Sequence, residues 1–415
     1  GITVSRADKL EDKILISGNE AAGLGAVYGG ATFCSWYPIT PSTSLAEGYE
    51  KYAKKFRIEN NTGKNLYASV QAEDELAAIG MAIGANWNGA RGFTATSGPG
   101  ISLMSEFLGL AYFAEIPLVL FNVQRGGPST GMPTRTQQSD VLACAYASHG
   151  DTKHVVLFPS DPKECFDFSA QAFDLADQLQ TPIFVVSDLD MGMNDWVCDK
   201  FKWDDEYKYN RGKVLNKDDL DEIENFGRYL DVDNDGICYR TYPGTHPEKG
   251  AFFTRGTSHD EYARYTEDGE VNAATLSRLM KKFRTASELV PEPVIEINGE
   301  DSCGVIFYGS TSPAVHEAKD ILKEKEINID LMQIRSFPFN LDVWEFIANH
   351  DRIYVVEQNR DSQMRTLIMA EGGISPEILR PLVHFTGDPI QASYIVNKIS
   401  EREVNYKSHI NAKKR

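Results

Sequence analysis

The sequence predicts an α/β protein in which two parallel-sheet units are joined by a long irregular segment. Short apolar runs alternate with helical patterns over residues 18–194, and the alternation resumes after about residue 300. Such alternation is typical of parallel sheets covered by helices on both faces. Residues 195–299 between the units are charged, aromatic and rich in turns. The predicted division is therefore 1–17, 18–194, 195–299 and 300–415.

The apolar runs of the first unit have the length of buried strands, and the patterns between them have the length of helices. Strands are predicted at residues 31–36, 66–70, 92–96, 117–123, 154–158 and 182–187. Helices are predicted at residues 19–30, 45–52, 74–87, 101–115 and 162–180. The sequence Ser97-Gly98-Pro99-Gly100 is expected to separate a strand from the helix that follows it.

The second unit follows the proline-rich boundary at residues 289–293. Strands are predicted at residues 303–308, 327–334 and 352–357, and helices at 312–326, 341–350 and 363–370. One helix, residues 273–284, is predicted within the bridging segment. The sequence opens with Gly1 and no initiator methionine, so residues 1–17 are interpreted as the tail of an upstream domain. The basic end, residues 411–415, is expected to fray.

The overall composition limits the kinds of partner and the cellular compartment that can be expected. The 415 residues are 42% hydrophobic and 25% charged, and no apolar run approaches the length of a membrane span. A net charge of −18 argues against nucleic acid or an anionic membrane as a partner. The six cysteines form no Cys-x-x-Cys motif, which predicts reduced thiols and no iron–sulfur or zinc site in this chain. We therefore expect a cytoplasmic protein.

Two patterns resemble ligand motifs only in part. The loop Asp231–Ile237 starts like an EF-hand, but the twelfth position is Tyr242 instead of glutamate, which predicts a solvated turn. The spacing of Gly18, Gly23 and Gly25 is not Gly-x-Gly-x-x-Gly. These glycines predict close helix packing, and no NAD site is expected.

The stretch Tyr37-Pro38-Ile39-Thr40-Pro41-Ser42-Thr43 lies between a predicted strand and a predicted helix. Its two prolines can continue neither element, and Thr40, which precedes a proline, is biased toward extended backbone. Ser42 or Thr43 is the expected N-cap of the helix. The result is a stiff turn at the carboxyl end of a strand, where open α/β sheets bind ligands. An ordinary strand-to-helix turn is the alternative.

A second stretch, Gln124–Thr134, follows the predicted apolar strand at residues 117–123. Arg125 stands at the strand's carboxyl end, where a guanidinium can hold a carboxylate through two hydrogen bonds. The glycines and proline that follow predict a tight loop. An exposed loop arginine is the alternative.

Together these stretches resemble signatures of the 2-oxoacid:ferredoxin oxidoreductases. Tyr37–Thr43 resembles the motif of the domain that holds the pyrimidine half of thiamine diphosphate. Gln124–Thr134 resembles the 2-oxoglutarate:ferredoxin oxidoreductase α subunit in particular, and the resemblance extends from about Gly18 to the end of the chain. It implies a thiamine-diphosphate-binding, pyrimidine-type parallel-sheet domain, followed by an α/β domain like the carboxy-terminal domain of transketolase.

The resemblance also implies a cofactor-activating glutamate. Glu75 starts a helix of small residues and precedes Gly84 by nine positions, a spacing found in many thiamine enzymes. A carboxyl group in an apolar site can hydrogen-bond the aminopyrimidine ring nitrogen. Glu73 is the second candidate, and a carboxylate that only stabilises the helix N-terminus is the structural alternative. Tyr37, Pro38, Ile39 and Thr40 are the other cofactor-binding residues that the resemblance implies.

For the substrate, the resemblance implies that Thr40 and Arg125 hold the 2-oxoacid and that Thr130 faces its side chain. A hydroxyl that caps its own loop is the alternative for Thr130. The superfamily's magnesium motif, Gly-Asp-Gly, is not present, because Asn234 and Glu267 precede the two Asp-Gly pairs. No metal ligands are therefore predicted here. A β subunit is expected to supply Mg²⁺, the diphosphate site and a [4Fe-4S] cluster.

The predicted function is the α subunit of a thiamine-dependent 2-oxoglutarate:ferredoxin oxidoreductase. The reaction converts 2-oxoglutarate, coenzyme A and oxidised ferredoxin to succinyl-CoA, carbon dioxide and reduced ferredoxin. In reverse it fixes carbon dioxide, as in a reductive TCA cycle. The expected assembly is a dimer of heterodimers. The alternatives are a pyruvate or broad-range enzyme of the same class, and a scaffold subunit without catalytic residues.

Overall fold

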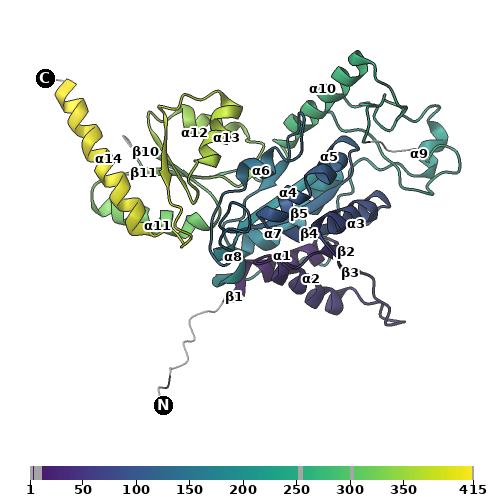
Figure 1. The fold of residues 1–415 in the computed structure, drawn as a ribbon, viewed down its shortest axis with the longest axis horizontal. Helices are drawn as coiled ribbons and strands as arrows, with labels where there is room; N and C mark the ends of the chain where they lie inside the picture. The colour runs from purple at the N-terminus through teal and green to yellow at the C-terminus, as the bar shows by residue number, and fades with distance from the viewer. Residues whose placement is uncertain (1–2, 4–11, 251–255, 300–302, 414–415) are drawn as a thin grey trace.

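The computed structural model describes residues 3, 12–250, 256–299 and 303–413 (Figure 1). The first unit contains a seven-stranded sheet with the order β12-β6-β7-β5-β4-β2-β3. Neighbouring strands run parallel except β12, which is antiparallel to β6. The strands are β2 (Phe33–Trp36), β3 (Ala68–Gln71), β4 (Gly92–Thr96), β5 (Leu118–Gln124), β6 (Val155–Leu157), β7 (Pro182–Asp188) and β12 (Ser336–Phe337).

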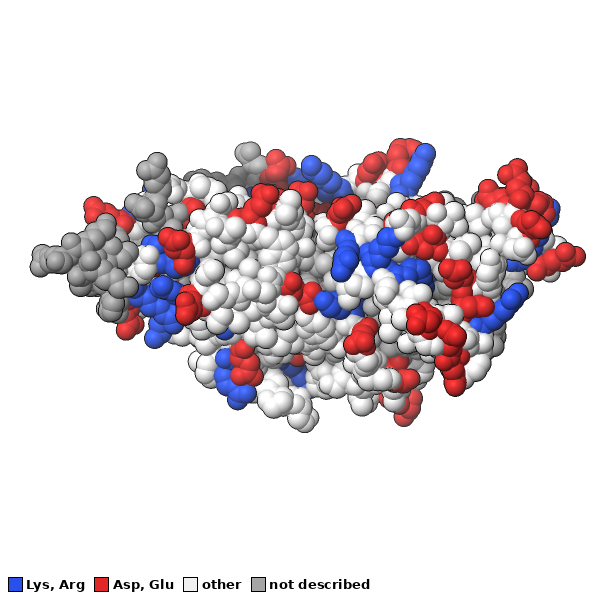
Figure 2. All heavy atoms as spheres, turned by 90° about the horizontal axis from the view of Figure 1, so that it is seen from above, with Lys and Arg blue, Asp and Glu red and all other residues white. Residues whose placement is uncertain are grey.

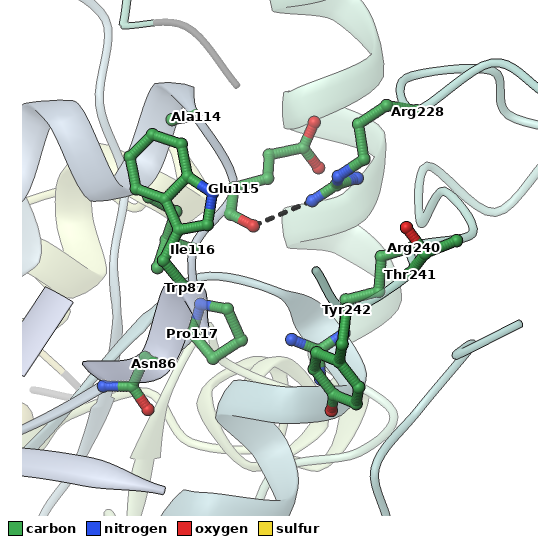
Figure 3. Close-up of a pocket in the computed structure, with 10 residues that line it drawn as sticks. All are labelled: Asn86, Trp87, Ala114, Glu115, Ile116, Pro117, Arg228, Arg240, Thr241 and Tyr242. Atoms are coloured by element: carbon green, nitrogen blue, oxygen red, sulfur yellow. Dashed lines mark hydrogen bonds between the residues drawn. The ribbon is translucent and has the colours of Figure 1, made fainter. Parts of the chain in front are cut away.

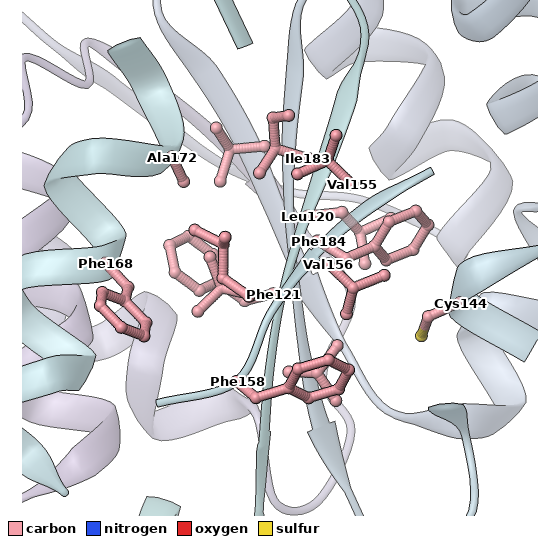
Figure 4. Close-up of a cluster of buried hydrophobic side chains, with 14 of the residues drawn as sticks. Leu120, Phe121, Cys144, Val155, Val156, Phe158, Phe168, Ala172, Ile183 and Phe184 are labelled. Carbon is pink, nitrogen blue, oxygen red and sulfur yellow. The ribbon is translucent and has the colours of Figure 1, made fainter. Parts of the chain in front are cut away.

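Helices cover both faces of this sheet, as the alternation predicts. They are α1 (Gly18–Tyr28), α2 (Thr43–Phe56), α3 (Glu75–Trp87), α4 (Gly98–Leu103), α5 (Ser105–Phe113), α6 (Val141–Ala145), α7 (Pro162–Leu179) and α8 (Leu189–Met193). Side chains alternate between the faces along each strand. Phe121 therefore points toward Phe168 and Ala172 of α7, while Phe184 lies on the other face with Cys144 of α6 (Figure 4).

The glycines of α1 confirm the prediction of close helix packing. A Cβ at Gly23 would lie 2.5 Å from the backbone nitrogen of Tyr49 in α2. A Cβ at Gly25 would lie 2.3 Å from the carbonyl oxygen of Phe166 in α7. Because both obstacles are backbone atoms, α1 can lie between α2 and α7 only with glycine at these positions.

Residues 97–100 end strand β4 as predicted, but the helix that follows begins before residue 101. Helix α4 begins at Gly98, with Ser97 at the N-cap position and Pro99 in its first turn. Proline is favoured there because the first N–H groups of a helix have no intrahelical partner. The predicted helix over residues 101–115 is divided at Met104 between α4 and α5.

The second unit has a five-stranded sheet with the order β14-β13-β10-β11-β9, in which β9 is antiparallel to β11. Its strands are β9 (Val294–Glu296), β10 (Cys303–Phe307), β11 (Ile329–Gln333), β13 (Ile353–Glu357) and β14 (Leu379–Val383). Its helices are the 3-10 turn η1 (Gly309–Thr311), α11 (Ser312–Glu324), α12 (Leu341–Ala348), α13 (Gln363–Gly372) and α14 (Ala392–Lys413). Strands β9, β12 and β14 and helix α14 were not predicted from the sequence. Of the end expected to fray, residues 414–415 lie outside the described part.

The bridging segment contains β8 (Asp195–Asp199), α9 (Lys217–Glu222) and α10 (Gly269–Ala286). Strand β8 pairs antiparallel with β1 (Lys13–Ser17), so the end of the predicted 1–17 tail is paired with the start of the bridging segment. Residues 1–2 and 4–11 lie outside the described residues. Figure 2 shows acidic side chains gathered toward the end of the molecule where Figure 1 places α9 and α10. Among the described residues, no helix has the length and apolarity needed to cross a membrane.

The EF-hand-like loop holds lysine side chains against its carboxylates. The Lys213 ammonium lies 2.7 Å from Asp233 and 2.8 Å from Asp235, and Lys281 lies 3.4 Å from Asp231. Asp231 also accepts the backbone N–H groups of Asp235 and Gly236. The carboxylates thus have cationic partners within the chain.

Candidate functional site

The candidate site lies at the carboxyl edge of the first sheet. Strands β2, β4 and β5 are parallel and adjacent, so their carboxyl ends meet at one edge. Residues 37–43 follow β2, residues 97–100 follow β4, and the glycine-rich loop (residues 126–134) follows β5 closely. This edge is where parallel sheets of this kind bind ligands.

The turn after β2 is fixed by hydroxyl groups that bind Ile39. The Thr43 hydroxyl accepts the N–H of Ile39 at 3.0 Å, and the Ser42 hydroxyl donates to the Ile39 carbonyl at 3.2 Å. Ser42 occupies the predicted N-cap position, but its side chain makes no capping bond to the helix. Asn19 of α1 donates to the Pro41 carbonyl at 2.8 Å. Hydrogen bonds within the turn and from α1 therefore fix the backbone of residues 39–41.

The two motifs contact each other directly. Arg125 is only 8% exposed, and its Nη1 donates to the carbonyl oxygen of Thr40 at 2.7 Å. The interpretation of Arg125 as an exposed loop residue is therefore wrong. Its Nε is buried and has no hydrogen-bond partner among the described residues. The Nε is thus an unsatisfied donor beside Thr40, which is exposed.

The glycine-rich loop closes tightly and presents Thr130 on its surface. The N–H of Met132 donates to the Gly126 carbonyl at 2.7 Å, and Gly126 donates to the Arg135 carbonyl at 3.0 Å. A Cβ at Gly131, whose φ is +54°, would lie 1.9 Å from the Gly126 carbonyl oxygen. Thr130 is exposed and makes no hydrogen bond within the described part of the chain, so its hydroxyl does not cap the loop.

Glu75 is the buried carboxylate of the site. It is 6% exposed at the first position of α3, whereas Glu73 and Asp74 are exposed. Asp74 caps the helix by accepting the N–H of Ala77 at 2.7 Å, so helix stabilisation already has its own carboxylate. The Glu75 carboxylate has no hydrogen-bond partner within the described residues. This geometry favours Glu75 over Glu73.

Glycine at position 100 lets α4 pack directly against Glu75. A Cβ at Gly100, in the first turn of α4, would lie 1.9 Å from the Thr96 hydroxyl and 3.0 Å from Cγ of Glu75. A buried carboxylate without a partner, facing a glycine-lined turn at the carboxyl edge, fits the requirement for an aminopyrimidine ring. The residues present therefore fit the organic half of thiamine diphosphate.

A polar group near Arg125, formed by Asn122 and Asp140, was not predicted from the sequence. Asn122 of β5 donates to the Asp140 carboxylate at 3.1 Å, and a Cβ at Gly98 would lie 2.9 Å from both carboxylate oxygens. Burial raises the pKa of Asp140 to about 6, although Asn122 opposes the shift. The Ser97 hydroxyl and the side-chain oxygen Oδ1 of Asn122 are buried without partners among the described residues. The asparagine within the apolar run Leu118–Gln124 was the available signal.

A second group of buried charges serves another purpose. Glu115 follows α5 and pairs with Arg278 and with Lys282 of α10 at 2.8 Å, and Arg228 donates to its carbonyl at 2.9 Å (Figure 3). Burial alone would raise the pKa of Glu115, but Arg278 and Lys282 hold it well below its usual range. A small cavity of about 30 Å³ adjoins this group. The cluster attaches the bridging segment to the first unit. Within the described residues, no three His, Cys, Asp or Glu side chains form a metal-binding group.

Comparison with known proteins places these features in one family. Residues 24–197 match the family "Pyruvate flavodoxin/ferredoxin oxidoreductase, thiamine diP-bdg". The chain is 34% identical to the 2-oxoacid:ferredoxin oxidoreductase subunit alpha of Saccharolobus solfataricus over 88% of its own length and 58% of the relative. It is 32% identical to the 2-oxoglutarate synthase subunit KorA of Methanothermobacter thermautotrophicus, over 90% of this chain and 95% of that protein. The chain thus spans about 60% of the larger α subunits that it matches.

Two solved structures confirm the predicted fold class. The 2-oxoglutarate:ferredoxin oxidoreductase from Magnetococcus marinus, solved with 2-oxoglutarate, coenzyme A and succinyl-CoA, matches at a TM-score of 0.86 and 31% identity, over 96% of this chain and 66% of that one. A split-gene transketolase matches at a TM-score of 0.53 and 10% identity, over 93% of this chain and 97% of that chain, which shows the fold alone. With its thiamine-type domain and the near-complete match to KorA, the chain belongs to the α-subunit family of the 2-oxoacid:ferredoxin oxidoreductases.

Proposed function

We propose that the chain is the α subunit of a 2-oxoglutarate:ferredoxin oxidoreductase that forms succinyl-CoA and carbon dioxide. The observation that carries the proposal is the buried Arg125 guanidinium, tied to Thr40 at 2.7 Å with its Nε unpartnered among the described residues. The KorA relative of Methanothermobacter thermautotrophicus and the Magnetococcus marinus enzyme are named for 2-oxoglutarate, which supports this substrate.

Each residue of the site has a role that its geometry allows. Glu75 holds the aminopyrimidine of thiamine diphosphate, because its carboxylate is buried and free to bind a ring nitrogen. The cofactor supplies the electron sink for loss of carbon dioxide from the 2-oxoacid. Tyr37, Pro38 and Ile39 line the approach to it at the end of β2.

The substrate is held from two directions. Arg125 binds the carboxylate next to the reacting carbonyl through its Nε edge, and the Thr40 hydroxyl donates to the same end of the substrate. Thr130, on the exposed surface of the glycine-rich loop, meets the distal side chain. Discrimination among 2-oxoacids thus depends on the loop, while Arg125 and Thr40 serve every 2-oxoacid.

The remaining parts of the enzyme belong to a partner in this proposal. A β subunit carries the diphosphate site with Mg²⁺ and the [4Fe-4S] cluster that passes electrons to ferredoxin, and the assembly is a cytoplasmic dimer of heterodimers. The relatives are named as subunits, which supports a shared active site. A broad-range or pyruvate enzyme is the second candidate, because the Saccharolobus solfataricus relative is named for 2-oxoacids in general.

The test is turnover by the complex co-purified with its β subunit. We expect ferredoxin reduction that requires coenzyme A, with kcat/KM for 2-oxoglutarate well above that for pyruvate. Equal or higher kcat/KM for pyruvate would establish the broad-range candidate. A complex that contains thiamine diphosphate only in the partner, and turns over equally well when this chain carries Arg125→Ala, would establish a scaffold role.

A further inference from the structure

The segment that follows the glycine-rich loop is attached to the second α/β unit. Residues 135–139 lead from this loop toward α6 and pass along the carboxyl ends of β10 and β13. Gln138, at the centre of this segment, is 1% exposed. A buried glutamine must satisfy its amide group within the protein, and here it does so across the two units.

All four polar atoms of Gln138 form hydrogen bonds with the second unit. Its backbone N–H donates to the Gln358 carbonyl at 2.8 Å, and its Nε2 donates to the Tyr308 carbonyl at 3.2 Å. Its side-chain oxygen accepts from the Thr311 hydroxyl at 3.2 Å and from the N–H of Gln358 at 3.1 Å. Its carbonyl accepts from Asn359 Nδ2 at 2.9 Å. Gln138 therefore fixes the segment to the strand ends of the second sheet.

The same unit also reaches the glycine-rich loop itself. The N–H of Thr136 donates to the Gly387 carbonyl at 3.0 Å, and Arg135 pairs with Asp388 at 2.9 Å. A Cβ at Gly387 would lie 2.8 Å from the terminal methyl of Met132. The loop connecting β14 to α14 thus packs against the glycine-rich loop with no space for a side chain.

The glycine-rich loop has few anchors of its own. Gly126 and Met132 close it, while Gly127, Ser129 and Thr130 are exposed. Gly127 also donates to the side-chain oxygen of Gln137 at 3.1 Å, so the position of the loop depends on Arg125 in the first unit and on the segment that Gln138 attaches to the second. We propose that the second α/β unit positions the glycine-rich loop, and with it the side-chain end of the 2-oxoacid site, through Gln138 as the positioning residue. The expected change in kinetics rests on the proposed function, whereas the expected change in loop position rests on the structure alone.

A positioning role predicts a selective effect. Loss of the Gln138 amide should move the loop and Thr130 but leave Arg125 tied to Thr40, so carboxylate binding by Arg125 and cofactor binding by Glu75 should persist. Coupling through such networks typically changes binding by roughly three- to thirtyfold. We expect KM for 2-oxoglutarate to rise by that factor, kcat to change less, and the ratio of kcat/KM between 2-oxoglutarate and pyruvate to fall.

The matched control is Gln333 of β11, another buried glutamine that joins the two units. Its Nε2 donates to Ser160 at 2.9 Å and to Glu164 at 3.1 Å, with no contact to the glycine-rich loop. Gln138→Ala and Gln333→Ala should therefore lower the melting temperature similarly. Only Gln138→Ala should raise KM and speed amide hydrogen exchange over residues 126–134, measured by mass spectrometry on the full complex.

Equal exchange over residues 126–134 in both variants, or equal changes in KM, would overturn the proposal. If Gln138→Ala does not fold, Gln138→Met keeps the length of the side chain without a charge and removes its amide hydrogen bonds, and the same comparison applies. A wild-type complex that oxidises no 2-oxoacid would contradict the proposed function, while hydrogen exchange would still decide whether Gln138 positions the loop.

Discussion

Arg125 and Thr40 stand 85 positions apart in the chain, and Nη1 of Arg125 donates to the carbonyl oxygen of Thr40 at 2.7 Å. The bond joins the turn after β2 to the end of β5, so the two most distinctive stretches of the sequence form one structural unit. The bond also uses Nη1 of the guanidinium and thereby fixes the orientation of its Nε. In the proposed function, substrate binding and backbone positioning are divided between the nitrogens of a single side chain.

Arg125→Lys should reduce kcat/KM for 2-oxoglutarate by about ten- to a hundredfold. Lysine keeps the charge but cannot hold Thr40 and a carboxylate through a planar fork, and a charge-assisted hydrogen bond contributes about 1.5–3 kcal/mol. Affinity for thiamine diphosphate, measured by calorimetry, should not change. Arg360→Lys, at an exposed pair with Asp361, is the control. Wild-type kcat/KM in Arg125→Lys would move the substrate site elsewhere.

Thr130→Ala should change substrate preference instead of overall activity. Removal of one neutral hydrogen bond costs about 0.5–1.5 kcal/mol, so kcat/KM should fall roughly two- to tenfold for 2-oxoglutarate and little for pyruvate. Ser129→Ala, in the same loop, should leave the ratio of the two substrates unchanged. Steady-state kinetics with both 2-oxoacids measures the ratio, and a parallel decrease for both would refute a role at the side-chain end.

Most of the first sheet could be predicted because its strands are continuous apolar runs such as residues 118–123. Glu75 and Arg125 could be placed because each follows a strand or opens a helix with a clear pattern. The burial of Glu75 and the exposure of Glu73 then separate two carboxylates that sequence alone left open. Local pattern placed these residues at a helix start and a strand end, and the family resemblance singled them out as candidate site residues.

What could not be predicted depends on contacts between distant segments. Ser336 and Phe337 of β12 follow the second unit in sequence but pair with Leu157 and Val156 in the first sheet. Strand β14 contains a proline and lies at an edge, where proline is tolerated. The partners of Gln138 are at least 170 positions away, so nothing near it in sequence signals its burial.

The buried Asp188 predicts a pH dependence of stability. Burial raises the pKa of Asp188 to about 6, although the Ser310 hydroxyl donates to the carboxylate. Because the folded state binds this proton more tightly than the unfolded state, its contribution to the free energy of unfolding falls as pH rises from about 4 to about 6.

Asp188→Asn removes that contribution. Relative to wild type, the variant should gain stability as pH rises across this window, by at most about 3 kcal/mol, since one pKa unit corresponds to about 1.4 kcal/mol. Urea unfolding of both proteins at pH 4.5 and 7.5 measures the difference, in which the other carboxyl groups cancel. The same difference at both pH values would show that Asp188 does not titrate in this range.

Lys282→Met should destabilise the attachment of the bridging segment. Glu115 would lose one of its two cationic side-chain partners inside the protein, and breaking a buried ion pair in this way typically costs about 3–5 kcal/mol. Urea unfolding measures the loss. Lys217→Met removes an exposed partner of Asp221 and should leave the unfolding midpoint unchanged. Equal midpoints for both variants would contradict the role assigned to the buried cluster.

The central claim is that this chain activates thiamine diphosphate through Glu75, and the most direct measurement is hydrogen–deuterium exchange at C2 of the cofactor bound to the complex. Glu75→Gln should slow the exchange by roughly 10²–10⁴-fold, the usual contribution of a group that assists proton transfer, with folding and cofactor content retained. Glu73→Gln, at the exposed neighbouring carboxylate, should exchange at the wild-type rate. Unchanged exchange in Glu75→Gln, or a loss in Glu73→Gln instead, would contradict the account.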